Sequence, residues 1–103
     1  MKSEKQRIAI AEACGWVGVQ QDAECKLVGI NPNNDPERIP DYLNDLNAMH
    51  EAEKVIDDYM GYVSNLYSVV RQSNGWAVEI SVITATATQR AEAFLKTLNL
   101  WEQ

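Results

Sequence analysis

Histidine, phenylalanine and cysteine are scarce in this sequence of 103 residues. His50 is the single histidine, one phenylalanine is present, and Cys14 and Cys25 are the two cysteines. A Ser-His or Cys-His catalytic triad would have to use His50, and nothing in the sequence around it supports one. Two cysteines are too few for a disulfide scaffold, so we expect reduced thiols and a cytoplasmic location.

Positive charge is also in short supply. Lysine and arginine total 9 against 15 acidic residues, which gives a net charge of -6. Nucleic-acid polymers and anionic membranes favour basic surfaces, so neither is expected as a partner. No apolar run approaches the roughly 18 residues of a membrane span, and Met1 to Lys5 lead into no apolar core of signal-peptide length.

The remaining composition is that of a folded globular chain. Hydrophobic residues make up 46% of the sequence and charged residues 23%. These values argue against extended disorder. The length predicts a single domain over residues 1–103, with a core large enough to need no metal or disulfide.

Capping patterns mark the first and last helices. Ser3 followed by Gln6 has capping-box spacing and predicts a helix over residues 4–14, which Gly15 would end in the left-handed conformation. Thr86 and Gln89 have the same spacing before the last helix. The apolar side of that last helix would consist of Ala91, Phe94, Leu95 and Leu98.

Three segments have the composition of strands. Residues 16–21 and 24–30 flank a short polar turn and predict a hairpin, while residues 31–38 predict a surface loop rich in proline and asparagine. The clearest alternation of apolar and polar residues lies in 76–83, which predicts a third strand. Its apolar positions are Trp76, Val78, Ile80 and Val82.

A second helix is predicted to begin at Pro40 or Asp41, with Asp41 as its cap, and to end near Ile56 or Met60. Glu53 falls at the centre of its apolar stripe, with His50 beside it. The stripe contains Tyr42, Leu46, Met49, Ile56 and Met60. A third helix is then predicted from the helical spacing of Val63, Leu66, Tyr67 and Val70.

The predicted order of elements is therefore α-β-β-α-α-β-α. About three strands and about four helices define an α+β fold, a small layered sandwich in which helices cover at least one face of the sheet. Such a small sheet has two edges, and pairing across a homo-oligomer is one way to protect them.

Glu53 and His50 are the candidates for buried polar residues. A buried carboxylate needs a cation or donor, which Arg90, Arg71 or a tyrosine hydroxyl could provide. A structural ion pair is the stronger interpretation, and a general-acid role would need a second reactive group facing Glu53. The spacing of His50, Glu53 and Asp57 is also compatible with a metal, but we predict neither a metal nor a cofactor.

The turn before the last helix is the candidate ligand-binding site. Thr84, Thr86 and Thr88 cluster at a helix N-terminus, where free N–H groups favour anions, and Arg90 follows in the first turn. The alternative is that the threonines only cap the helix and continue the strand. Trp16 and Trp76 could each stack on a ligand or fill the core.

Three blocks of this chain resemble a family of small phage and prophage proteins described as an ABA (α/β/α) sandwich domain. The blocks are residues 8–16, 39–54 and 84–95, in the expected order, whereas the loop at 31–38 is shorter than in many relatives. The resemblance implies a layered fold, a phage origin and a location in the infected bacterial cell. It supplies no catalytic residues.

Small phage proteins of this kind are often assembly factors or accessory proteins that counter host defence, including oligomers that sequester nucleotide signals. The resemblance thus favours a non-enzymatic accessory protein that binds a small anionic ligand such as a nucleotide signal. Arg90 and the threonines would hold phosphate and a tryptophan would stack. The alternatives are an assembly or host-interaction protein acting through protein contacts and, third, an enzyme using Glu53 and His50.

Overall fold

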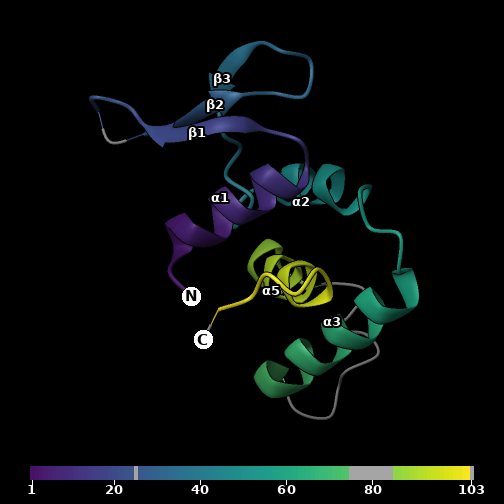
Figure 1. The fold of residues 1–103 in the computed structure, drawn as a ribbon. Helices are drawn as coiled ribbons and strands as arrows, with labels where there is room; N and C mark the ends of the chain where they lie inside the picture. Colours follow the sequence, from purple (N-terminus) through teal and green to yellow (C-terminus); the bar gives the residue numbers. More distant parts are fainter. Residues whose placement is uncertain (25, 75–84, 103) are drawn as a thin grey trace.

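The computed structural model describes residues 1–24, 26–74 and 85–102. Four helices and three strands occur in these ranges (Figure 1). In chain order they are α1 (Ser3–Ala13), β1 (Val17–Gln21), β2 (Leu27–Ile30), β3 (Pro36–Arg38), α2 (Leu46–Glu53), α3 (Tyr59–Asn74) and α5 (Ala87–Thr97).

The fold is α+β, as the sequence predicted. The strands form one antiparallel sheet in the order β1-β2-β3. α5 packs against α1, α2 and α3, and the sheet lies beyond α1 on the side away from α5 (Figure 1). The largest fully buried side chains are Phe94, Ile10, Met49, Leu95 and Val70, so helices supply the centre of the core. No helix in the described ranges is long and apolar enough to cross a membrane.

The two faces of the sheet have different surroundings. Leu27 and Gly29 are buried on the inner face, toward α1, together with Ile39, which follows β3. Arg7 of α1 fastens this end of the sheet, because its Nη2 donates to the Ile39 carbonyl over 2.9 Å. Residues that alternate with Leu27 and Gly29 point to the opposite, outer face.

The third strand of the sheet lies where the sequence predicted a loop. Residues 31–38 form the end of a hairpin, in which Pro36–Arg38 pair with β2. Asn31 closes the turn, because its side-chain oxygen accepts from the backbone N–H groups of Asn33 and Asp35. Proline is tolerated in β3 because this is an edge strand. The predicted strand over 76–83 lies outside the described residues.

The second helix is shorter at both ends than predicted. Asp45, rather than Asp41, caps α2 by accepting from the N–H groups of Asn47 and Ala48. Asp41 instead accepts from Asn44 and Asp45 through its backbone carbonyl, in a separate turn. The chain leaves the helix after Glu53 and starts again at Tyr59.

This break divides the predicted apolar stripe. Tyr42, Met49 and Ile56 are buried, but Leu46 and Met60 are exposed. The predicted stripe requires one continuous helix. Where that helix is interrupted, the side chains no longer point in the direction that helical spacing predicts.

Helix caps differ at the two ends of the chain. The capping box at Thr86 and Gln89 is present, with both reciprocal hydrogen bonds, and Gly15 has the expected positive φ of 98°. The predicted box at Ser3 and Gln6 is wrong, because the helix begins at Ser3 without a side-chain cap. The Gln6 side chain instead donates to the Met1 carbonyl over 3.1 Å.

Candidate functional site

Glu53 and Arg90 form an ion pair between the last residue of α2 and the first turn of α5. Arg90 Nη1 lies 3.2 Å from Glu53 Oε2 and 3.4 Å from Oε1, and the side chains are 12% exposed for Glu53 and 13% for Arg90. Arg90 Nε also donates to the Ala85 carbonyl over 3.2 Å. The guanidinium therefore joins the end of α2 to α5 and to the residues just before α5.

His50 completes the pair from the solvent side. Its Nδ1 lies 3.0 Å from Glu53 Oε1, and its own side chain is 51% exposed. The structure thus places Glu53 out of solvent but leaves His50 at the surface. With Glu53 held by both groups, its carboxylate is engaged in contacts within the chain.

Tyr62 is a buried neighbour of Glu53 and Arg90. Its hydroxyl is buried and makes no hydrogen bond of good geometry with the described residues. Burial, followed by the neighbouring Glu53 carboxylate, raises the pKa of Tyr62 far above the ordinary tyrosine value. The phenol therefore stays neutral beside the ion pair.

The threonine turn has partners inside the protein. Thr86 Oγ1 accepts from the backbone N–H of Gln89 over 3.1 Å, and Thr88 Oγ1 donates to the Leu43 carbonyl over 2.8 Å. Arg90 is turned toward Glu53. Thr84 lies outside the described residues. The described part of this turn therefore caps α5 and fastens it to the segment before α2.

Of the two candidate tryptophans, Trp16 belongs to the core and is 8% exposed. It borders a cavity of about 300 Å³ that also touches Cys14 and Tyr42. Burial raises the pKa of Cys14 to about 11, and the Tyr42 hydroxyl offsets part of this effect. Trp76 lies outside the described residues.

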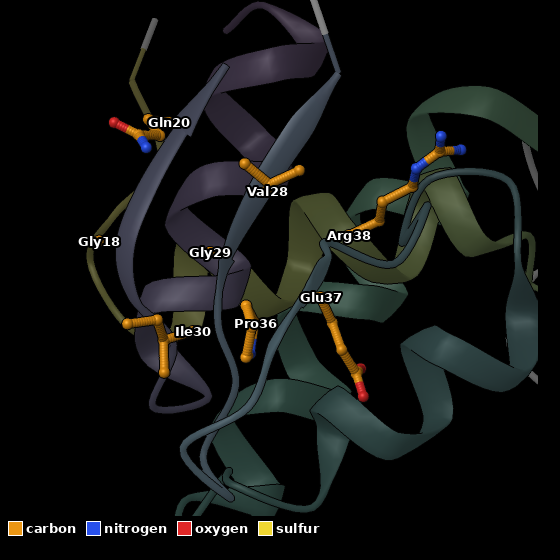
Figure 2. A pocket seen from close by; sticks show the side chains of 8 residues that line it. All are labelled: Gly18, Gln20, Val28, Gly29, Ile30, Pro36, Glu37 and Arg38. Carbon is orange, nitrogen blue, oxygen red and sulfur yellow. The ribbon is translucent and has the colours of Figure 1, made fainter. Parts of the chain in front are cut away.

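A larger hollow of about 570 Å³ lies on the outer face of the sheet (Figure 2). Two rows of side chains cross the three strands there, because directly paired residues of an antiparallel sheet point to the same face. One row is Val17, Ile30 and Pro36, and the other is Gln20, Val28 and Arg38. The lining of the hollow consists of these residues apart from Val17, together with Gly18, Gly29 and Glu37.

The outer face is apolar but open. Val17 is 58% exposed and Ile30 37% exposed, and none of the described helices lies over this side of the sheet (Figure 1). β2 reads Leu-Val-Gly-Ile without a polar residue, which is typical of a strand covered on both faces. The apolar run of β2 is visible in the sequence. The residues that lie beside it on the outer face follow only from the strand register in the structure.

Among the described residues, no three His, Cys, Asp or Glu side chains lie together in a position to hold a metal ion. Comparison of the chain with protein-family models, curated proteins and solved structures gave no match. The resemblance to a phage ABA-sandwich family therefore stays a prediction from the sequence.

Proposed function

We propose that this chain is a non-catalytic binding protein that recognises another protein through the outer face of its sheet. The observation that supports this proposal is the exposed row of Val17, Ile30 and Pro36 beside a wholly apolar β2. Contiguous exposed apolar surface with a polar rim is typical of protein interaction sites. Gln20 and Arg38 provide that rim.

The shape of the hollow favours a protein partner over a small molecule. Small-molecule sites enclose most of their ligand and usually present aromatic side chains. This hollow lies on one open sheet face, and its lining contains no aromatic residue. A partner that inserts an aliphatic or aromatic side chain between the two rows would cover Val28 and Ile30.

Arg38 contributes a positive charge to the rim of the outer face. It is an exposed cation in a chain of net charge -6. A carboxylate on the partner would meet Arg38 at the rim, where charge pairs mainly affect the rate of association. Arg38→Glu should therefore slow binding and reverse its salt dependence, with a smaller effect on dissociation.

The test begins with a photo-crosslinking residue at position 17, introduced in the native cell to identify the partner. The purified partner is then titrated with the original protein and with Ile30→Lys. We expect Ile30→Lys to weaken binding at least about tenfold, the effect of a residue near the centre of an interface. Ser68→Glu, on the exposed side of α3, is the matched control. Equal affinity for Ile30→Lys and the original protein would contradict the proposal.

The anionic-ligand function remains a separate prediction from the sequence. Thr86, Thr88 and Arg90 all have partners within the chain, so ligand binding there would have to displace existing contacts. Calorimetry against cyclic and linear nucleotides, with Arg90→Ala as the comparison, tests it. Heat that disappears in an Arg90→Ala variant whose circular dichroism shows it to be folded would favour the ligand function over the protein partner.

A further inference from the structure

A second exposed apolar surface lies on α3, far along the chain from the sheet. Met60, Val63, Tyr67 and Arg71 follow one another at intervals of three or four residues, so they occupy one side of the helix. Met60 is 84% exposed, and Val63 and Tyr67 are 49% and 41% exposed. Tyr59, at the first position of α3, is also exposed and extends this stripe.

The buried side of the same helix has its partner already. Tyr62, Leu66, Val69 and Val70 are buried, and α3 packs along α5. The exposed stripe is therefore an additional apolar surface, adjacent to the one that holds α3 in the fold. An amphipathic helix normally needs only one apolar side.

The charges at the two ends of the stripe have opposite signs. Asp57 and Asp58 precede its N-terminal end, and Arg71 lies at its C-terminal end, one turn beyond Tyr67. All three residues are exposed. Asp58 also caps the helix by accepting from the Gly61 N–H over 2.9 Å, whereas Asp57 makes no hydrogen bond or ion pair with the described residues.

We propose that this stripe is a homodimer interface, in which α3 packs antiparallel against α3 of a second copy of the chain. With a twofold axis between Val63 and Tyr67, Val63 of each copy faces Tyr67 of the other. Arg71 then lies beside Asp57 and Tyr59 of the opposite copy. A parallel arrangement would instead place arginine against arginine and acid against acid.

The charge pattern selects a second copy over an unrelated partner. In an antiparallel pair, the acidic end of one stripe lies beside the basic end of the other. Two copies therefore form two favourable charge contacts, one at each end. A single 16-residue helix is about 24 Å long. Such a contact is small by the standard of stable interfaces, so we expect a dimer that dissociates on dilution.

Sedimentation velocity over a concentration range from about 1 to about 500 µM measures this equilibrium. The original chain should shift from monomer to dimer as the concentration rises, and Val63→Glu should stay monomeric. Arg71→Asp and Asp57→Arg should each raise the dissociation constant at least about tenfold. The double variant exchanges the two charges and should return it to within about threefold of the original.

Two matched variants separate this surface from others. Ser68→Gln enlarges an exposed side chain of α3 outside the stripe without adding a charge beside Arg71, and Ile30→Lys alters the outer sheet face; both should leave the dimer unchanged. The charge exchange keeps the test decisive even if Val63→Glu does not fold. A monomer at all concentrations, a double variant no better than the singles, or loss of the dimer in Ile30→Lys would overturn the proposal.

Discussion

Arg90 and Glu53, 37 positions apart in the chain, meet as an ion pair whose atoms are 3.2 Å apart and largely screened from solvent. The pair ties the end of α2 to the start of α5. The second contact of Glu53, with His50, lies at the surface.

Glu53→Gln should destabilise the fold by about 2 to 4 kcal/mol, because it leaves the Arg90 guanidinium without its carboxylate in a poorly solvated position. Urea unfolding followed by circular dichroism measures the change. Glu51→Gln is the control, since Glu51 pairs with Lys54 at the surface over 3.0 Å and should change stability by less than about 1 kcal/mol. Equal losses in the two variants would show that the buried pair contributes little.

Thr86→Ala should lower the free energy of unfolding by about 1 kcal/mol, because it removes the acceptor for the Gln89 N–H at the start of α5. Thr86→Ser retains the oxygen and should unfold close to the original midpoint. Thermal melts of the three proteins compare them directly. A serine variant as unstable as the alanine variant would assign the effect to the methyl group and not to the cap.

Gly61→Ala should be destabilising, although alanine normally favours a helix by about 1 kcal/mol over glycine. A Cβ at position 61 would overlap the carboxylate of Asp58, which caps α3 through the Gly61 N–H. In an Asp58→Ala background the overlap is absent, so the same substitution should become stabilising. A double-mutant cycle from urea unfolding provides the measurement, and the same sign in both backgrounds would contradict the steric explanation.

Cys14 should react slowly with iodoacetamide at pH 8. Burial raises its pKa to about 11 from an ordinary value near 9, so the thiolate is about 100-fold less abundant than in an exposed cysteine. Because the folded state favours the protonated thiol, this contribution to stability is complete below pH 9 and is lost as the pH rises toward 11. Mass spectrometry of the Cys25→Ser variant isolates the rate at Cys14, and a rate equal to that of a free peptide thiol would contradict the prediction.

The sequence predicted the parts of the fold that depend on local signals. The box of Thr86 and Gln89 and the left-handed Gly15 are such signals, and both are confirmed. The boundaries of α2 were wrong because Asp41 and Asp45 are equally good caps, and only tertiary packing of Tyr42 and Leu43 decides between them. The strand at Pro36 was missed because an edge strand permits a proline that argues against a strand elsewhere.

The candidate site was predicted in part. The position of Glu53 within an apolar stripe predicted that it needs a partner, with Arg90, Arg71 or a tyrosine hydroxyl as the candidates, and the structure pairs it with Arg90. The outer sheet face could not be inferred, because it depends on which residues of β1 and β3 lie opposite Val28 and Ile30. Register is a property of pairing and has no local sequence signal.

The central position of α5 has a consequence for the order of events during synthesis. α5 packs against each of the other three described helices, but it follows all of them in the chain. A growing polypeptide therefore cannot bury the inner sides of α1, α2 and α3 until residue 97 has left the ribosome. Until then those apolar surfaces are open to chaperones, so the final packing step of this domain has to wait for the synthesis of α5.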